Sequence, residues 1–403
     1  MQTFPDAFLR EIPKTDVHLH LDGSLRISTL IELAQKKGVP LPAADEQGLR
    51  ETVFKDSYAS LDEYLRGFSL TTAVMDDRES VERIAYELAE DSFAEGVRYI
   101  EVRLAPQLHI RDDFPMEDVL GAVDSGLNKA KEEWNRALAE NEPEYDFGII
   151  VCAMRYCNGH FSPWYKSFFE THRYSDPEEV MRLASLELVR GAVKIRDSQG
   201  LRIVGFDIAG SEKGYPASNH KDAYEYAHKN FLHKTVHAGE AYGAESIFTA
   251  ITKCHADRIG HGLLLFSEED IADPDIADKK AYAQNLANYI ADRRITIEVC
   301  LTSNLQTNPR FRDIREHSLG KMLEAGISVS FCTDNRLVSN TTVCKELRLA
   351  LDNFPISGRK LRDIVVYGFK RSFRFGSYRE KRKYVRSCID WYDSVAEKYG
   401  ISD

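Results

Sequence analysis

The chain has 403 residues, of which 43% are hydrophobic and 29% are charged, and its formal net charge at pH 7 is −11. This composition is typical of a globular protein with a large core, and the lack of any run of 18 apolar residues argues against a membrane-spanning helix. An acidic protein does not attract phosphate backbones, so nucleic acid is not an expected partner, whereas a neutral small molecule remains possible.

The first predicted strand, Thr15–Leu21, contains two histidines, His18 and His20. Residues two apart on a strand point to the same face, so both imidazoles can approach one point in space. Two imidazoles at one point suit a metal ion such as Zn²⁺, although the same alternation also arises when two polar residues face solvent. The pair alone leaves both interpretations open, and further ligands must come from elsewhere in the chain.

Short apolar runs alternate with helical patterns along the chain. The predicted strands are Thr15–Leu21, Val97–Leu104, Phe147–Ala153, Leu201–Ile208, Lys234–His237, Arg258–Gly260, Ile295–Leu301 and Ile327–Thr333. Several are rich in Val and Ile, as parallel strands buried on both faces are. Between the first two, Val81–Glu95 places apolar residues on one side of a helix that ends before Gly96. Eight parallel strands alternating with helices predict an α/β fold, the (β/α)₈ TIM-type barrel.

Two stretches do not fit this repeat, and we expect both to be insertions in a single domain that spans residues 1–403. The stretch 40–75 has five apolar side chains at helical spacing: Tyr58, Leu61, Tyr64, Leu65 and Phe68. This spacing is typical either of a core face or of a helix that covers a pocket. The stretch 160–200 carries several aromatic side chains, then a predicted helix from Pro177. No Pro- or Gly-rich linker marks a domain boundary.

Reactive residues of α/β barrels lie at the C-terminal ends of the strands. The predicted strand ends carry these polar residues: His18, His20, Asp22, Asp207, His237, Glu240, His261, Glu298, Ser303 and Asp334. Each has a local explanation, such as a helix N-cap or a surface histidine, but together they predict a functional site at one rim of the barrel. The other eight histidines, including His160 and His317, are expected on the surface or in packing.

Eight motifs stand out along the chain, and six of them contain nine of the ten polar residues at the predicted strand ends. The motifs are Pro13–Gly23, Arg83–Glu87, Gly96–Pro106, Asp207–Gly210, Thr235–Glu240, Arg258–Gly262, Glu298–Cys300 and Thr333–Asp334. In order and spacing, from about residue 9 to residue 350, the chain resembles the adenosine deaminase family of metal-dependent amidohydrolase-type barrels. The resemblance implies that extra helices cover the C-terminal face of the barrel.

The resemblance also implies a metal site and a reaction. One Zn²⁺ per chain is expected on His18, His20, His237 and Asp334, three nitrogens and one oxygen with a position left for water. Water then attacks C6 of the adenine ring, Glu240 gives a proton to N1, and His261 acts either as a base or as an electrostatic partner of the attacking water. Asp334 also orients this water. The implied reaction converts adenosine, and 2′-deoxyadenosine, to inosine and ammonia in purine metabolism.

The resemblance further implies contacts with the substrate. These are Asp22 at the ribose hydroxyl, His20, the backbone N–H of Gly210 at N3, and a hydrophobic wall of Leu61, Tyr64, Leu65 and Phe68. Asp207 and Ser303 are expected to orient the ligands and the base. Many members have a second aspartate after the ligand aspartate, whereas this chain has Asn335, followed by Arg336. An asparagine can donate an N–H to the N7 acceptor of a purine, so that contact can be kept.

Other functions stay open at this point. Adenine, adenosine phosphate (AMP) or aminofutalosine are alternative substrates, although no cluster of Arg and Lys for an anionic substrate is apparent in the sequence. A non-catalytic metal-binding relative would be expected to lose Glu240 or a ligand, and none is lost here. No Gly-x-Ser-x-Gly motif is present, which argues against a serine hydrolase. The seven cysteines form no Cys-x-x-Cys pair and the first residues do not resemble a secretory signal, so we expect a cytoplasmic location.

Overall fold

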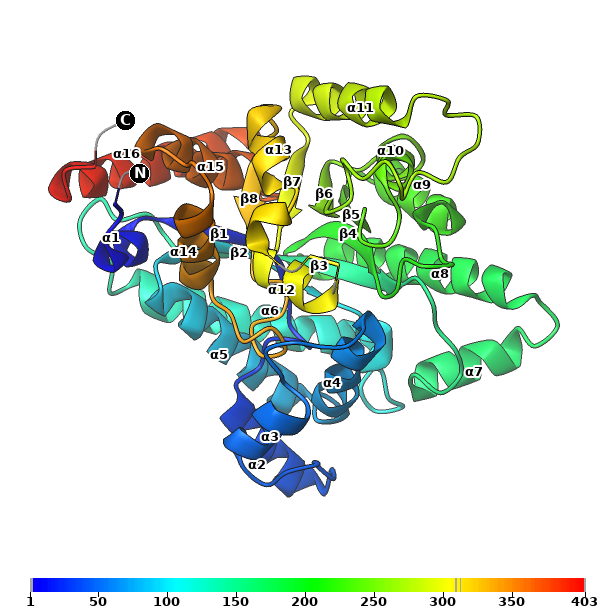
Figure 1. Cartoon of the computed structure of the whole chain (residues 1–403). Helices are drawn as coiled ribbons and strands as arrows, with labels where there is room; N and C mark the ends of the chain where they lie inside the picture. Colours follow the sequence, from blue (N-terminus) through cyan, green and yellow to red (C-terminus); the bar gives the residue numbers. More distant parts are fainter. Residues whose placement is uncertain (1–2, 309, 312, 402–403) are drawn as a thin grey trace.

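The computed structural model describes residues 3–308, 310–311 and 313–401, and its eight strands form one parallel sheet (Figure 1). The strands are β1 (Lys14–His20), β2 (Val97–Leu104), β3 (Asp146–Met154), β4 (Ile203–Ala209), β5 (His233–Ala238), β6 (Arg258–His261), β7 (Thr296–Val299) and β8 (Val329–Phe331). Neighbouring strands pair in chain order from β1 to β8, and Leu19 of β1 bridges to Asp334 just after β8. The eight predicted strands and the (β/α)₈ barrel are confirmed.

Helices surround this sheet. They are α1 (Asp6–Glu11), α2 (Ile27–Lys37), α3 (Glu46–Thr52), α4 (Leu61–Ala73), α5 (Arg78–Ala94), α6 (Met116–Asn135), α7 (Pro163–Thr171), α8 (Pro177–Gln199), α9 (Lys221–Lys229), α10 (Ala244–Lys253), α11 (Lys279–Arg293), α12 (Leu301–Thr307), α13 (Leu319–Glu324), α14 (Val343–Asn353), α15 (Gly358–Arg371) and α16 (Tyr378–Lys398), with short 3₁₀ turns at Pro106–Leu108, Ala217–His220 and Ile314–Glu316. The predicted helix 81–95 is α5. It begins after Asp77, whose carboxylate accepts the Ser80 N–H at 2.8 Å.

The stretch 40–75 combines the two roles that its spacing allowed. Tyr58 and Tyr64 are buried and their rings meet edge to face, with centroids 5.1 Å apart. Leu65 and Phe68 of α4 face a cavity at the C-terminal end of the barrel. Leu61 begins α4, but its side chain lies outside the described part of the structure. Helix α4 is therefore both a core element and a cover.

The stretch 160–200 contains two helices with different places in the barrel. Helix α8 connects β3 to β4 and packs against both strands, as the regular helices of such a barrel do. Helix α7 is additional, and in Figure 1 it lies at the edge of the molecule beside the connection to α8. The turn before α7 reaches the cavity through His160 and Phe161.

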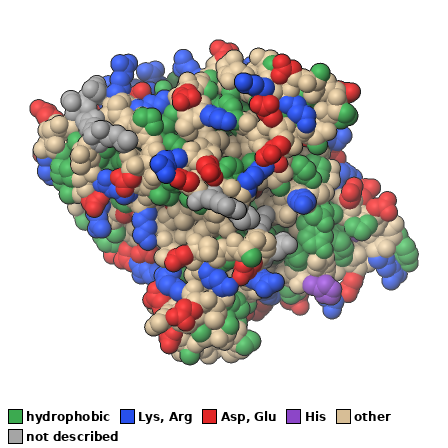
Figure 2. Space-filling model, in the orientation of Figure 1, with side chains coloured by type: hydrophobic (Ala, Val, Ile, Leu, Met, Phe, Trp, Pro, Cys, Tyr) green, Lys and Arg blue, Asp and Glu red, His purple; other side chains and the backbone are tan. Residues whose placement is uncertain are grey.

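The surface shown in Figure 2 has Lys and Arg side chains interspersed with Asp and Glu. No helix within the described ranges combines the length and the apolarity that a membrane span requires. The interior is apolar at most positions, but Glu101 and Arg103, two apart on β2, are fully buried inside the barrel. The barrel interior just below its C-terminal rim is therefore charged at these two positions. Both side chains belong to an ion network that reaches the candidate site.

Candidate active site

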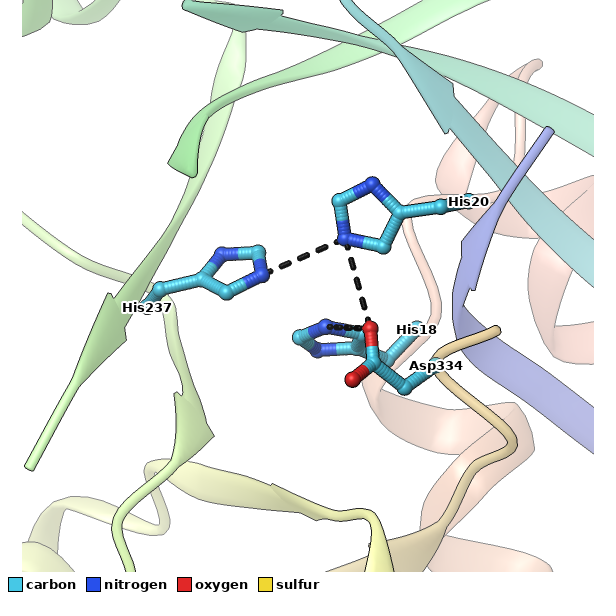
Figure 3. A group of neighbouring side chains, drawn as sticks. All are labelled: His18, His20, His237 and Asp334. Atoms are coloured by element: carbon cyan, nitrogen blue, oxygen red, sulfur yellow. Dashed lines mark hydrogen bonds and ion pairs between the residues drawn. The ribbon is translucent and has the colours of Figure 1, made fainter. Parts of the chain in front are cut away.

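Four side chains from three separate segments meet at the rim of the barrel (Figure 3). His18 and His20 come from β1, His237 from β5, and Asp334 from the loop after β8. One ligand atom from each lies within 4.8 Å of the other three, and all four residues are buried. The His20 Nε2 atom is 3.2 Å from His237 Nε2 and 3.5 Å from Asp334 Oδ1. The structure thus brings together all four predicted ligands.

Two buried carboxylates fix the tautomers of two of these imidazoles, His18 and His237. His18 Nδ1 donates to Glu298 Oε2 at 2.7 Å, and His237 Nδ1 lies 3.0 Å from Asp207 Oδ2. With the protons on Nδ1, the Nε2 lone pairs face the centre of the cluster. His18 Nε2 and Asp334 Oδ1 then face each other as two acceptors, 3.4 Å apart. Two buried acceptors without a shared proton are unfavourable unless a cation lies between them, so the donor set fits a metal ion.

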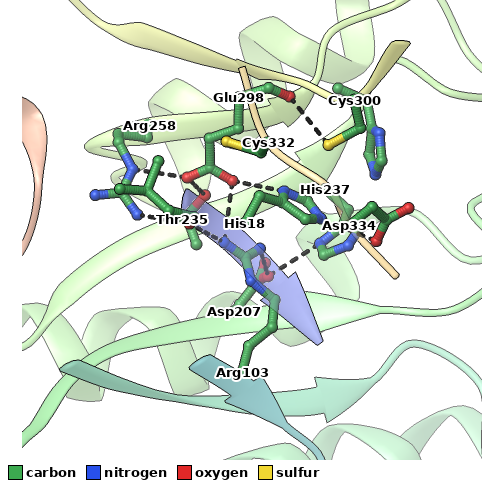
Figure 4. A network of polar contacts seen from close by, with 12 residues as sticks. His18, Arg103, Asp207, Thr235, His237, Arg258, Glu298, Cys300, Cys332 and Asp334 are labelled. Carbon is green, nitrogen blue, oxygen red and sulfur yellow. Dashed lines mark hydrogen bonds and ion pairs between the residues drawn. The ribbon is translucent and has the colours of Figure 1, made fainter. Parts of the chain in front are cut away.

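An ion network inside the barrel supports those carboxylates (Figure 4). Arg103 contacts Asp207 Oδ2 at 2.5 Å and Glu298 Oε2 at 3.1 Å. Arg258 contacts Glu298 Oε1 at 2.6 Å and also pairs with Glu101. Burial alone would raise the pKa of Glu298, but Arg103 and Arg258 outweigh burial and hold this pKa well below its usual value. Glu298 therefore stays ionised and can keep the proton of His18 on Nδ1.

Glu240 lies in the loop after β5, with its side chain 17% exposed. Its Oε1 atom is 3.5 Å from His261 Nε2. Burial, together with the nearby charges of Glu212 and Asp334, raises the pKa of Glu240 to about 8. A carboxyl group with this pKa is mostly protonated at neutral pH and can serve as a general acid.

The tautomer of His261 follows from a chain of hydrogen bonds that begins at a backbone amide. The Leu319 N–H donates to His317 Nδ1 at 3.0 Å, and burial lowers the pKa of His317 to about 4, so this ring is neutral with its proton on Nε2. That proton goes to Asn304 Oδ1 at 3.1 Å. The Asn304 amide nitrogen then donates to His261 Nδ1 at 3.0 Å. Neutral His261 consequently carries its proton on Nε2, the atom nearer Glu240.

A cavity of about 390 Å³ adjoins this cluster. Its apolar side is formed by Leu65, Phe68, Leu108, Met154 and Phe161. The predicted site residues His20, Asp22, Tyr64, Gly210, His237, Glu240, His261, Asp334 and Asn335 also line it. An apolar cavity with a few convergent polar groups is typical of a small-molecule site.

Asp22 and Gly210 have distinct features in this cavity. Asp22 is 4% exposed, and its Oδ1 atom is buried without a hydrogen-bond partner among the described residues. Burial and the charge of Asp334 raise the pKa of Asp22 to about 7. Gly210 has φ +97°, and an added Cβ would lie 3.6 Å from Met154, so backbone conformation rather than space within the protein favours glycine here.

Asn335 also lines the cavity, but one of its amide hydrogens is already used. Its Nδ2 atom donates to the Tyr64 hydroxyl at 2.7 Å, and that hydroxyl is 2.8 Å from Ser339 Oγ. The amide has a second hydrogen, so a contact with a ligand remains available. Tyr64 therefore has two roles, one in the wall of the cavity and one in holding Asn335.

Sequence reasoning missed several residues of this site. His317 and His160 were expected on the surface or in packing, yet His317 is 3% exposed in the hydrogen-bond chain to His261, and His160 lines the cavity. Asn304 and Glu212 were not among the predicted site residues. Glu101 and Arg103 lie in the motif Gly96–Pro106, but no role was predicted for them, although two charges at alternate positions of an apolar strand point to one face. No such sequence signal marked His317, because its hydrogen-bond partner Asn304 comes from another segment.

Comparison with known proteins identifies the family to which this chain belongs. The adenosine deaminase family model matches residues 13–391. "Adenosine deaminase 1" of Streptomyces coelicolor is 35% identical over 372 residues, which cover 92% of this chain and 84% of that protein. "Adenosine deaminase" of Mycobacterium leprae is 35% identical over 368 residues, which cover 91% of each chain.

Solved structures show the same fold. An N6-mAMP deaminase from Arabidopsis is 25% identical, with a TM-score of 0.70, covering 95% of this chain and 99% of that one. The similarity to these two relatives covers 92% and 91% of the chain, and the residues matched by the family model include every motif that lines the cavity. The chain therefore belongs to the adenosine deaminase family and is a deaminating hydrolase.

Proposed function

We propose that the chain catalyses the hydrolytic deamination of adenosine, and of 2′-deoxyadenosine, to inosine and ammonia. This proposal rests on the polarity of the side chains that line the cavity. Asp22 Oδ1 is buried and has no hydrogen-bond partner among the described residues, and no Lys or Arg is found among the described residues that line the cavity. A carboxylate suits the hydroxyl groups of a ribose, whereas a phosphate requires cationic partners. A neutral purine nucleoside is therefore favoured over AMP.

A single domain over residues 1–403 and a cytoplasmic location stay predictions.

We propose one Zn²⁺ per chain on His18, His20, His237 and Asp334, since three imidazole nitrogens and one carboxylate oxygen are ligands that Zn²⁺ prefers. A bound Zn²⁺ would act as a Lewis acid and lower the pKa of water toward neutrality. Ser303 Oγ donates to Asp334 Oδ2 at 2.6 Å, which leaves Oδ1 directed at the imidazoles. Ser303 thus orients the carboxylate, as was expected from the sequence.

Glu240 is the proposed general acid. Its protonated carboxyl gives a proton to N1 of the purine, which makes C6 more electrophilic. The oxygen of water then adds to C6 and loses both of its protons. One proton goes to N6 as the C6–N6 bond breaks, and the other returns to the Glu240 carboxylate. The products are inosine and ammonia, so one water is consumed and the charges balance.

His261 is proposed to donate a hydrogen bond to the attacking oxygen. The sequence left two roles open for it, a base or an electrostatic partner. A base at Nε2 would need a free lone pair there, but the chain from Leu319 through His317 and Asn304 puts the proton on Nε2. The hydrogen-bond geometry therefore favours the electrostatic role.

The remaining contacts follow from the cavity wall. Asp22 and His20 would hold the ribose, the Gly210 N–H would reach N3, and Asn335 would donate its second amide hydrogen to N7. Leu65 and Phe68 would cover the base. These side chains surround a volume of about 390 Å³, which accommodates a nucleoside.

The test is the loss of absorbance near the adenine band for a panel of substrates, with and without a chelator. The panel contains adenosine, 2′-deoxyadenosine, adenine, AMP, N6-methyl-AMP and aminofutalosine. We expect the two nucleosides to have the highest kcat/KM and the chelated enzyme to be inactive. A higher kcat/KM for AMP or N6-methyl-AMP would refute the nucleoside assignment, and equal activity in chelator would refute the metal.

A further inference from the structure

Glu212, in the loop after β4, is a buried carboxylate with an unusual set of donors. It is 1% exposed. Its two oxygens accept from the backbone amides of Gly239, Glu240, Ala241 and Tyr242, at 3.1, 2.9, 2.7 and 3.2 Å, and from Ser246 Oγ at 2.5 Å. Four consecutive amides are therefore directed at one side chain.

These four amides belong to the loop that carries the proposed acid. The loop follows β5 and ends where α10 begins at Ala244. Hydrogen bonds from N–H groups to a carboxylate are stronger than those between neutral groups, so Glu212 holds the loop backbone firmly. The Glu240 amide itself is one of the donors, at 2.9 Å. The backbone position of Glu240 thus depends on a side chain from a neighbouring strand end.

We propose that Glu212 is a positioning residue for Glu240, fixing the backbone at residue 240 so that the acid carboxyl faces N1 of the purine. This inference rests on the proposed function, because it assumes that Glu240 is the general acid. Glu212 does not line the cavity and would act only through Glu240.

The charge of Glu212 supports the same role. The groups that act on Glu240 come from five segments: Glu212 after β4, Asp334 after β8, Arg155 after β3, His18 on β1 and His261 on β6. Burial first, then Glu212 and Asp334, raise the pKa of Glu240, whereas Arg155 and His18 lower it. Removing the charge of Glu212 should therefore lower the pH at which Glu240 loses its proton.

The main test is Glu212→Gln, which keeps the size of the side chain but replaces one acceptor oxygen with an NH₂ group. We expect kcat to fall by about 10- to 100-fold, a typical loss for a residue that orients another, while KM and zinc content change little. We also expect the alkaline limb of the pH profile, where kcat/KM falls as the pH rises, to move to lower pH. A merely structural role would not produce this shift. An unchanged kcat and an unchanged limb would overturn the proposal.

A double-mutant cycle separates this role from a general loss of structure. If Glu212 acts through Glu240, then Glu212→Gln should lower kcat far less in a Glu240→Gln background than in the parent. An equal loss in both backgrounds would overturn the proposal. If Glu240→Gln alone keeps parental turnover, the acid assignment of the proposed function fails instead, and the two failures are distinguishable.

Two further variants complete the design. Asp146→Asn is the matched control, because Asp146 is a 1% exposed carboxylate at the start of β3, paired with Lys131 and Arg202 at the opposite end of the barrel. It should lower the melting temperature without moving the alkaline limb. Glu212→Asp keeps the charge but is too short to reach every donor, so it should lower kcat and leave the limb in place. If Glu212→Gln does not fold, parental kcat in Glu212→Asp would overturn the proposal.

Discussion

The backbone N–H of His20 donates a hydrogen bond to the backbone carbonyl of Asp334 across 2.8 Å, and the Asp334 N–H donates to the His18 carbonyl at the same distance. These two bonds join β1 to the segment after β8 and therefore close the barrel. The same three residues supply three of the four proposed metal ligands. Main-chain pairing thus holds these ligands together, and a metal ion on their side chains would stabilise the closure of the barrel.

Removal of the metal should therefore affect both activity and stability. A ligand that binds only the folded state at 1,000 times its Kd stabilises that state by about 4 kcal/mol. We expect dialysis against a chelator to abolish deamination and to lower the melting temperature, and added Zn²⁺ to restore both. Elemental analysis before and after treatment measures the metal directly. Full activity in a metal-free preparation would contradict the assignment.

Glu240→Gln should keep the fold and the zinc but lose about 10²- to 10⁴-fold in kcat, because a general acid contributes a factor of this size. Since the pKa of Glu240 is raised to about 8, the protonated acid is present below this pH and is lost as the pH rises through it. The parent should therefore lose kcat/KM at alkaline pH, and the variant should lack this limb. A parental kcat with zinc in place would make Glu240 structural.

Asn304→Asp should reverse the tautomer of His261. A carboxylate only accepts, so it would draw the proton of His261 to Nδ1 and remove the donor from Nε2. We expect kcat to fall by about 10- to 100-fold, as for other residues that orient catalytic groups. Nitrogen-15 spectra of labelled histidine report the tautomer. Asn128→Asp on α6 is a control outside the cavity, and an unchanged kcat together with a reversed tautomer would restore the role of base.

Asn335→Ala should weaken the recognition of the purine N7 atom. 7-Deazaadenosine has a C–H in place of the N7 acceptor, and loss of a hydrogen bond of this kind costs roughly 1–3 kcal/mol, or about one to two decades in kcat/KM. We expect the parent to discriminate against 7-deazaadenosine by this factor and the variant to be slow on adenosine with less discrimination. Equal discrimination by both proteins would show that Asn335 does not read N7.

The barrel and the His18–His20 pair could be predicted from local sequence. His237 and Asp334 as ligands, and Asp207 and Ser303 as groups that orient them, followed only from the resemblance to the family. The roles of His317 and Asn304 were not predicted. His18 and His20 are adjacent on one strand face, and apolar runs mark most strands, so neighbours in sequence carry both signals. The contacts of His18 with Glu298, and of His317 with Asn304, join distant or irregular segments. Asp334 and His261 also have φ values of +59° and +65°, which are uncommon for residues with a side chain and are not apparent from composition.

The ion network inside the barrel has a consequence for which ion the site accepts. Arg103 and Arg258 are buried with three carboxylates, Glu101, Asp207 and Glu298, so this group carries one excess negative charge. Asp334 adds a second. A divalent cation brings this buried set to electroneutrality, whereas a monovalent ion leaves one negative charge, and a trivalent ion one positive charge, without compensation in a poorly solvated interior. If the site binds a metal ion, as proposed, the charge of this buried group should favour a divalent ion, and the imidazoles should favour Zn²⁺ among divalent ions.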